Sequence, residues 1–205
     1  MHGVAGDGLK AFVLHYGVGN VFSVEKAFKG LGFDVEVGRK LHKGVDCLVL
    51  PGVGSFQAAA EDISSYRGEL VDVMRSGIPV LGICLGMQIL FEESEEGPGK
   101  GLSLLRGRVV SLPEGVKKPH MGWNRIWKTG SSKLLEGVGH EWVYFNHTYY
   151  PSPEDSGLVL ARTSYGVEFP SVIGSGNVYG TQFHPEKSSS TGLKILQNFR
   201  SIVRV

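Results

Sequence analysis

Cysteine is scarce in this chain. Only Cys47 and Cys84 occur among 205 residues, and Cys47 lies inside the apolar run Cys47-Leu48-Val49-Leu50, which indicates a core position. Two cysteines do not indicate a disulfide framework, so the small disulfide-stapled class of secreted protein is excluded and a reducing compartment is favoured. We therefore expect the protein to act in the cytoplasm.

Long apolar runs and an excess of one charge sign are also missing. No apolar run approaches the roughly 20 residues that a membrane-spanning helix needs. Lys and Arg together number 21 against 20 Asp and Glu, and the sequence has no basic stripe of the kind that nucleic acid demands. We expect neither a membrane nor a nucleic-acid partner.

The remaining composition is that of a globular protein. Hydrophobic residues make up 41% of the chain and charged residues 20%, which suits a soluble domain with a real core. Residues 1–8 have neither an apolar signal core nor an Arg-rich transit character, and we expect residues 1–10 to form a loose N-terminal tail. No internal repeat is visible, so we expect a single domain over residues 1–205.

The first half of the sequence alternates strand and helix patterns. Apolar runs predict strands at residues 11–14, 33–37, 45–50 and 80–83. Apolar faces at helical spacing predict helices at residues 21–31 with Asn20 as cap, at 58–76 with a weak point near Ser64-Ser65, and at 85–92. This alternation predicts a parallel sheet that helices cover on both faces.

The second half changes character. Strand-like segments separated by turns occur at residues 109–112, 125–128, 142–146, 158–163, 171–174 and 178–183. A last helix is predicted at residues 192–203, capped by Ser190 or Thr191, with Leu193, Leu196, Phe199 and Val203 along one side. The predicted fold is therefore α/β: a mostly parallel sheet flanked by helices, with an antiparallel β extension packed on it.

Cys84 stands at the joint between the strand of residues 80–83 and the helix that follows. A nucleophile on a sharp strand-to-helix turn needs small neighbours two residues to either side, and Gly82 and Gly86 supply them. The turn also aims the positive end of the helix at the sulfur, which favours the thiolate when a base is near. A small buried cysteine at a tight turn is the plain alternative.

The run Gln182-Phe183-His184-Pro185-Glu186 supplies a possible base. It reads as a strand running into a loop, where residues two apart point the same way, so His184 and Glu186 can act together. His184 would be the imidazole base and Glu186 the carboxylate that fixes its tautomer and stabilises the imidazolium. With Cys84 they form a candidate catalytic triad.

These stretches resemble a known family. Gly82-Ile83-Cys84-Leu85-Gly86-Met87-Gln88 followed by Gln182-Phe183-His184-Pro185-Glu186 is similar to the class I glutamine amidotransferases, which use Cys, His and Glu to release ammonia from glutamine. Within that family, five further stretches resemble the glutaminase subunits of imidazole glycerol phosphate synthases, from histidine biosynthesis. They are Tyr16-Gly17-Val18-Gly19-Asn20, Pro51-Gly52-Val53-Gly54-Ser55-Phe56, Pro119-His120-Met121-Gly122-Trp123-Asn124, Tyr144-Phe145-Asn146-His147-Thr148-Tyr149 and Pro185-Glu186-Lys187-Ser188-Ser189. The resemblance implies a flavodoxin-like fold and no cofactor.

The loop Pro51-Gly52-Val53-Gly54 leaves the carboxyl end of a predicted strand, the edge where open α/β sheets place ligands. Gly52 and Val53 are candidates for half of an oxyanion hole and the amide of Leu85 for the other half. A plain strand-to-helix connection is the alternative. The resemblance implies that this loop carries the oxyanion strand, whose peptide turns over before the hole forms and so keeps the glutaminase nearly idle until the partner is loaded.

The same resemblance implies a pocket for glutamine. Gln88, one helical turn after Cys84, lies on a suitable face. Glu96 matches a family residue that binds the amino end of glutamine, and Thr148 and Tyr149 match residues near its carboxylate end. For Glu96 the alternative is a solvated acidic run over residues 92–96.

The run His120-Met121-Gly122-Trp123-Asn124 is a candidate partner interface. Burial frequencies alone favour a core position for a Trp beside Gly and Met. The resemblance implies instead that this segment, together with Lys187, faces a barrel-shaped cyclase subunit in a heterodimer, across which ammonia passes without being protonated in water.

Three residues depart from the family pattern or invite a different reading. His15 stands where an aspartate is usual, and Asn146 stands where an aliphatic residue is usual. His147 has no carboxylate two residues on, so we assign it a structural or substrate-positioning role rather than that of the base.

Other functions compete with this one. A glutaminase of another pathway, such as the pyridoxal phosphate synthase type, would share the cysteine turn and the His-Pro-Glu run, although the Gly-Gly-Glu-Ser stretch expected there is missing. A free-standing cysteine hydrolase would work without a partner. A non-catalytic binding subunit would have lost Cys84, His184 or Glu186, and all three are present.

Overall fold

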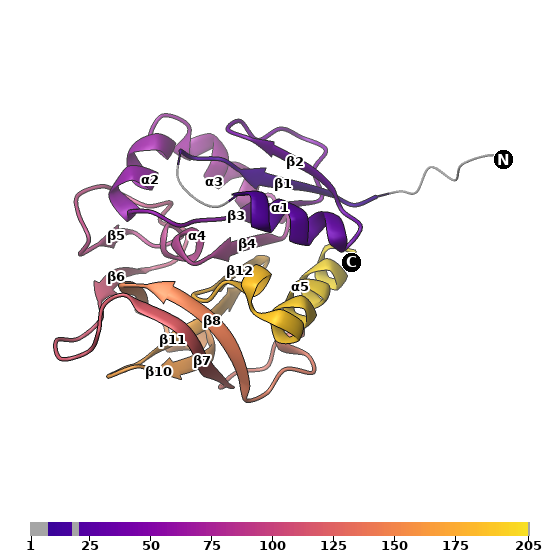
Figure 1. Ribbon diagram of the computed structural model, residues 1–205. Helices are drawn as coiled ribbons and strands as arrows, with labels where there is room; N and C mark the ends of the chain where they lie inside the picture. The colour runs from indigo at the N-terminus through magenta and orange to yellow at the C-terminus, as the bar shows by residue number, and fades with distance from the viewer. Residues whose placement is uncertain (1–7, 18–20, 205) are drawn as a thin grey trace.

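The computed structural model describes residues 8–17 and 21–204 (Figure 1). The predicted cap Asn20 and residues 1–7 of the predicted tail lie outside the described residues. Lys10, which was expected in the tail, is already the first residue of strand β1 (Lys10–Leu14). Its backbone N–H donates to the Asp46 carboxylate at 2.6 Å, which ties the start of the strand to the sheet.

One nine-stranded sheet runs through the molecule, in the order β2-β1-β3-β4-β12-β11-β10-β7-β8. Its parallel part holds β1, β2 (Asp34–Gly38), β3 (Cys47–Leu50), β4 (Val80–Ile83) and β12 (Val178–Thr181). Its antiparallel part holds β11 (Glu168–Ser175), β10 (Val159–Ser164), β7 (His120–Lys128) and β8 (Glu141–His147). The α/β prediction is confirmed, but the antiparallel strands continue the parallel sheet instead of packing on it.

A second, three-stranded sheet has the order β5-β6-β9. Its strands are β5 (Glu93–Ser94), β6 (Gly107–Ser111) and β9 (Tyr149–Pro153). Strand β9 follows β8 after a single residue, Thr148, so the chain passes from the large sheet into the small one at that residue. The sequence pattern predicted neither β5 nor β9.

Alternating side chains of the parallel strands face two different helical layers. Phe12 and Leu14 pack in one cluster with α2 (Phe56–Ile63) and α3 (Arg67–Arg75). Ala11 and Val13 pack in the other with α1 (Val21–Gly30) and α5 (Ser189–Val203), which lie side by side in Figure 1. A strand whose two faces are both covered reads as a continuous apolar run, which explains the pattern of residues 11–14.

The helix predicted at residues 58–76 is two helices. The chain breaks at residues 64–66, between α2 and α3, at the weak point that Ser64-Ser65 indicated. The Ser64 hydroxyl donates to the Glu61 carbonyl at 2.7 Å, the kind of side-chain to backbone bond that competes with helix continuation.

The helix predicted at residues 85–92 is much shorter than expected, since α4 covers only Leu85–Gln88. The carbonyls of the next turn accept hydrogen bonds from a distant loop instead of from their own helix. Leu102 N donates to Ile89 O at 2.7 Å and Leu104 N donates to Leu90 O at 3.0 Å. Pairing with a segment about a dozen residues away therefore ends the helix. The local sequence pattern does not predict this early end.

The last helix begins earlier than predicted. Helix α5 starts at Ser189, so neither Ser190 nor Thr191 is its cap, and Ser188 at the cap position makes no capping bond with its side chain. Leu193 is 48% exposed, so it is not on the buried face; Ile195 joins Leu196 and Phe199 there. None of the described helices has the length and apolar character that crossing a membrane requires.

Candidate active site

The site lies at the carboxyl ends of two neighbouring parallel strands. Strand β4 ends at Ile83, which pairs with Thr181 at the end of β12. The Cys84 N–H continues this ladder and donates to the Thr181 carbonyl at 2.7 Å. Pairing of segments almost 100 residues apart therefore brings Cys84 and the run 182–186 to the same edge of the sheet.

Cys84 sits in a backbone conformation that L-residues rarely adopt, with φ 53° and ψ −106°. The flanking glycines make the turn possible. A Cβ on Gly82 would lie 2.5 Å from the Gly86 carbonyl oxygen, and a Cβ on Gly86 would collide with the Leu50 carbonyl. The sharp strand-to-helix turn expected of a nucleophile is present, and its strain is held by the packing of β3 and β4.

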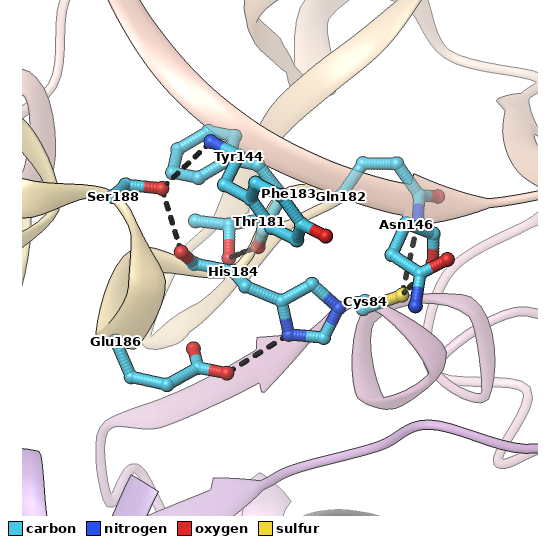
Figure 2. A network of polar contacts seen from close by, with 9 residues as sticks. All are labelled: Cys84, Tyr144, Asn146, Thr181, Gln182, Phe183, His184, Glu186 and Ser188. Atoms are coloured by element: carbon cyan, nitrogen blue, oxygen red, sulfur yellow. Dashed lines mark hydrogen bonds and ion pairs between the residues drawn. The ribbon is translucent and has the colours of Figure 1, made fainter. Parts of the chain in front are cut away.

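His184 and Glu186 form a buried ion pair. His184 Nδ1 and Glu186 Oε1 are 2.9 Å apart, and each side chain is 2% exposed. The other ring nitrogen, Nε2, makes no hydrogen bond with any described group, and Figure 2 shows it turned toward Cys84. The ring therefore bridges a carboxylate and a sulfur, which is the geometry of a triad base.

The surroundings of His184 keep its ring protonated. Burial lowers the pKa of His184, but the negative charge of Cys84 and the hydrogen bond and charge of Glu186 outweigh burial and raise it from 6.5 to about 10. An imidazolium next to the sulfur at neutral pH favours the thiolate form of Cys84.

Ser188 fixes the loop that carries His184. Its hydroxyl donates to the His184 carbonyl at 2.6 Å and accepts from the Tyr144 N–H at 2.9 Å (Figure 2). The His184 N–H in turn donates to the Tyr144 carbonyl at 2.9 Å. The backbone of His184 is thus bound to β8, which limits how far its ring can move away from Cys84.

Two further groups contact the sulfur. The Gln182 amide donates to Cys84 Sγ at 3.6 Å, and Cys84 Sγ lies 3.7 Å from the Asn146 carbonyl oxygen (Figure 2). Of these two groups, a thiol can donate to Asn146 O, whereas a thiolate can accept from the Gln182 amide. Sequence reasoning did not assign Gln182, although it lies in the same run as His184, two residues before it.

A pocket of about 190 Å³ opens beside Cys84. Polar side chains and backbone surround it, so it suits a small polar substrate. Apart from Cys84, the lining residues that the sequence also predicted are Val53, Leu85, Gln88, Glu96, Thr148 and Tyr149. Gly52 does not line the pocket but lies directly behind it, where a Cβ would be 2.6 Å from Leu85 Cβ.

Glu96 has a structural partner as well as a place in the pocket. Its Oε2 accepts from the Phe56 N–H at the start of α2, at 2.6 Å. The solvated acidic run is therefore not a full account of Glu96, because this carboxylate is anchored toward the pocket. Its second oxygen is the atom available to a substrate.

Tyr16 supports the loop predicted to form the oxyanion hole. Its hydroxyl donates to the Pro51 carbonyl, and its ring is fully buried. Burial first, and then the charge of Cys84, raise the pKa of Tyr16 far above its ordinary value, so the phenol stays a donor. The rest of that first Gly-rich stretch, residues 18–20, lies outside the described residues.

The predicted interface segment forms strand β7, whose side chains alternate in direction. Met121 and Trp123 are 61% and 51% exposed, whereas His120 is 3% exposed and points into the molecule. The Asn124 amide binds the Ser164 carbonyl at 3.0 Å, also on the inner side. Only part of the predicted interface is therefore presented by side chains. Trp142 of β8, opposite Arg125 of β7, is 53% exposed and extends the outer aromatic face.

Among the described residues, no group of three or more His, Cys, Asp or Glu side chains is placed to hold a metal ion.

Comparisons with known proteins agree on one family. Residues 13–202 match the family model described as glutamine amidotransferase class-I. The chain is 46% identical to imidazole glycerol phosphate synthase subunit HisH of Methanothermobacter thermautotrophicus, over 94% of this chain and 98% of that protein. It is 49% identical to the subunit of the same name from Geobacillus thermodenitrificans, over 93% and 95% of the two chains.

Solved structures show the same fold. A crystal structure of a glutamine amidotransferase superposes with a TM-score of 0.76 at 23% identity, covering 95% of this chain and 99% of that one. The structure of PurLQS from Thermotoga maritima superposes with a TM-score of 0.76 at 21% identity, covering 95% and 98%.

Proposed function

Because the chain belongs to the class I glutamine amidotransferase family, we propose that it is the glutaminase subunit of an imidazole glycerol phosphate synthase. It hydrolyses glutamine to glutamate and ammonia, and passes the ammonia to a cyclase subunit that makes imidazole glycerol phosphate and AICAR in histidine biosynthesis. The proposed catalytic activity rests on one observation: Cys84, His184 and Glu186 lie together at one edge of the sheet, beside a small polar pocket.

The first half of the reaction forms a thioester. The Cys84 thiolate attacks the carboxamide carbon of glutamine, and the tetrahedral oxyanion accepts hydrogen bonds from the Leu85 amide and from the Gly52-Val53 loop. The His184 imidazolium then gives its proton to the departing amine, which leaves as ammonia. Glu186 holds the ring in place at 2.9 Å throughout.

The second half restores the enzyme. Neutral His184 takes a proton from water as the water oxygen attacks the γ-glutamyl thioester. Collapse of the second tetrahedral species releases glutamate and regenerates the Cys84 thiolate beside the His184 imidazolium. One glutamine and one water thus give one glutamate and one ammonia.

The pocket supplies groups for both ends of glutamine. The second carboxylate oxygen of Glu96 would bind the α-amino group, and Thr148 and Tyr149 would hold the α-carboxylate end. Gln88 uses both amide hydrogens within the protein, on Tyr149 O at 2.8 Å and Gln182 Oε1 at 3.2 Å. Its own oxygen is left to accept a hydrogen bond from the substrate.

The outer face of β7 and β8 is the proposed contact with the cyclase subunit. Met121, Trp123 and Trp142 expose large apolar area on adjacent strands, and the same strand β8 carries Asn146, whose carbonyl reaches Cys84. Lys187, directly after the triad glutamate, would contribute at the edge of this face. A heterodimer that covers it would shield ammonia from water as it leaves the site.

We also propose the cytoplasm as the compartment. Both cysteines, Cys47 and Cys84, are free and buried, and a thiolate nucleophile needs a reducing environment to stay reduced.

The test is glutamate and ammonia release from glutamine by the purified chain. It is measured alone and with a candidate cyclase subunit plus its nucleotide substrate, and Cys84→Ala is the control. Little turnover alone, strong stimulation by the loaded partner and none in the mutant are expected. Vigorous turnover without a partner would indicate a free-standing hydrolase, and no turnover in any mixture would contradict the assignment.

A further inference from the structure

A chain of hydrogen bonds runs from strand β7 into the pocket. The Asn124 amide lies 3.2 Å from His120 Nε2, His120 Nδ1 lies 3.0 Å from His147 Nε2, and His147 Nδ1 lies 2.9 Å from the Tyr149 carbonyl. His147 and Tyr149 line the pocket beside Cys84. The mechanism proposed above uses neither histidine.

The partners at the two ends fix the direction of every bond. A carbonyl can only accept, so His147 carries its hydrogen on Nδ1 and its Nε2 accepts from His120. His120 must then donate from Nδ1 and accept at Nε2 from the Asn124 amide. That amide gives its second hydrogen to Ser164 O at 3.0 Å, and the Asn124 oxygen accepts from Arg125 N at 2.7 Å. Both rings are therefore neutral, and both carry the hydrogen on Nδ1.

The chain continues as far as the nucleophile. The Tyr149 carbonyl accepts a second hydrogen bond from Gln88 Nε2 at 2.8 Å. Gln88 gives its other hydrogen to Gln182 Oε1 at 3.2 Å, and Gln182 Nε2 donates to Cys84 Sγ at 3.6 Å. Each amide is thus oriented by its neighbour, and the last one presents N–H rather than oxygen to the sulfur.

The two histidines are enclosed by aromatic rings. His120 stacks on Tyr165 with ring centres 4.0 Å apart and on Phe145 at 4.7 Å, and His147 meets the edge of Phe169 at 5.1 Å. Their residues are 3% and 5% exposed. An apolar enclosure suits neutral rings, because it offers a charged ring no compensating solvent.

The surroundings of the two histidines also lower the pKa of both rings. Burial lowers the pKa of His120 from 6.5 to about 4. For His147, burial first, then the repulsion that a proton on His120 would add and the positive charge of His184, lower the pKa to about 3, against the bond to the Tyr149 carbonyl. The other titratable group on the pair is the Tyr165 phenol, which donates to Lys117 O at 2.9 Å. Within the described residues, no Asp or Glu side chain bonds to either ring.

We propose that His120 and His147 are positioning residues for the glutaminase reaction. As a neutral pair with fixed tautomers, they orient the Tyr149 carbonyl and, through Gln88 and Gln182, the N–H that faces the Cys84 sulfur. This inference rests on the proposed function. It also ties the inner side of β7 to the nucleophile, while the outer side of the same strand carries Met121 and Trp123.

The orientation matters because an amide is a donor on one side and an acceptor on the other. If the Tyr149 carbonyl loses its bond from His147, Gln88 is no longer fixed, and Gln182 is free to turn its oxygen to the sulfur. An oxygen in that place repels a thiolate, whereas the N–H stabilises it. Loss of the histidine pair therefore lowers the thiolate reactivity of Cys84 without touching the triad.

Imidazole nitrogen NMR of the whole chain at neutral pH tests the tautomers directly. Both His120 and His147 are expected as neutral rings with the hydrogen on Nδ1, the rarer form in free histidine. A hydrogen on Nε2, or an imidazolium at pH 7, at either position would overturn the proposal whether or not the chain proves to be a glutaminase.

Reactivity of Cys84 tests the positioning role. His120→Phe keeps an aromatic ring but removes both nitrogens, whereas His120→Asn keeps a donor close to the place of Nδ1. Alkylation of Cys84 by iodoacetamide is expected to slow about three- to tenfold in the Phe variant, with its pH profile moved to higher pH. It should stay within about twofold of wild type in the Asn variant. Tyr165→Phe is the matched control, since it keeps the stacking and removes only the bond to Lys117.

In the complex with the cyclase subunit, kcat for glutamine hydrolysis should fall in the same order, and KM should rise as well, because Gln88 and Tyr149 also line the pocket. Equal alkylation in the Phe variant and wild type would overturn the proposal, as would equal slowing in the Asn and Phe variants with thermal melting unchanged. If His120→Phe does not fold, Gln182→Glu is used instead, because it replaces the donor at the sulfur with an acceptor. This variant should also slow the alkylation of Cys84. Unchanged alkylation in Gln182→Glu would overturn the proposal. Wild-type chain that is inactive with every partner would instead contradict the proposed function alone.

Discussion

At the scale of single residues, the site separates its histidines by charge. His184 is surrounded by a sulfur and a carboxylate, which raise its pKa to about 10. His147, the last residue of β8, has a backbone carbonyl and an aromatic enclosure, and its pKa falls to about 3. Opposite environments within one site thus give one ring that moves protons and one that stays neutral.

This contrast predicts how stability depends on pH. His120 and His147 bind protons near pH 6.5 when unfolded but only near pH 4 and 3 when folded, so their stabilising contribution is complete above pH 6.5 and is lost as the pH falls. Between pH 6 and 5 the free energy of unfolding should fall by about 1 kcal/mol for each of the two histidines. Urea unfolding at the two pH values measures it.

His184 does not obscure that measurement. Its raised pKa gives stability that is present below pH 6.5 and is lost progressively as the pH rises from 6.5 to about 10. His120→Asn should make the dependence between pH 6 and 5 shallower. A free energy of unfolding that stays constant or rises on acidification in wild type would show that the pair is not buried and neutral.

The residues of the candidate triad could be predicted because each stands in a local pattern: glycines around Cys84, and a two-residue spacing between His184 and Glu186. Asn124, His120 and His147 offered no such pattern, because their contacts depend on the pairing of β7 with β8. Asn146 touches the sulfur through its backbone carbonyl, which any residue type would supply.

At the scale of elements, the turn between β4 and α4 is crowded by the backbone of β3. Gly86→Ala would drive a Cβ into the Leu50 carbonyl. We expect a loss of roughly 3 kcal/mol in unfolding free energy together with loss of glutaminase activity, because β3 and α4 must separate to make room.

Gly68→Ala in α3 is the control, since a Cβ there meets nothing within 4 Å. Alanine in a helix should raise stability by about 0.5–1 kcal/mol. Chemical denaturation of both variants measures these changes in the free energy of unfolding. Equal stability of Gly86→Ala and wild type would mean that the turn is less crowded than the structure shows.

The elements that the sequence predicted well are those with their own periodicity. Strand β1 and helix α1 carry apolar patterns that need no distant partner, and the break between α2 and α3 follows from two serines. The early end of α4 and strand β9 were missed because both depend on bonds to remote segments: residues 101–105 for α4, and β6 for β9. That the antiparallel strands extend the main sheet depends likewise on the remote pairing of β11 with β12.

At the scale of the whole molecule, the aromatic face of β7 and β8 stands at one edge of the nine-stranded sheet and β2 at the other. Trp123→Ala should weaken association with the cyclase subunit by about tenfold or more, because a large half-exposed aromatic ring is typical of an interface anchor. Isothermal titration calorimetry of the two subunits measures the change.

Val37→Ala on β2, at the opposite edge, removes an exposed apolar side chain from the far side of the sheet and should leave the affinity unchanged. If both variants bind as wild type does, the partner contacts another surface.

Because β4 pairs with β12, the site cannot form until both strands have been synthesised. Cys84 leaves the ribosome 100 residues before His184, from the difference of their positions in the sequence. At typical translation rates of 5–20 residues per second, that interval lasts about 5–20 s. Throughout it the nascent chain has a cysteine but no imidazolium to activate it, and β4 lacks the neighbour that completes the turn. A chain truncated before residue 184 therefore lacks the histidine that activates Cys84, and the activated thiolate arises only in a protein translated almost to its end.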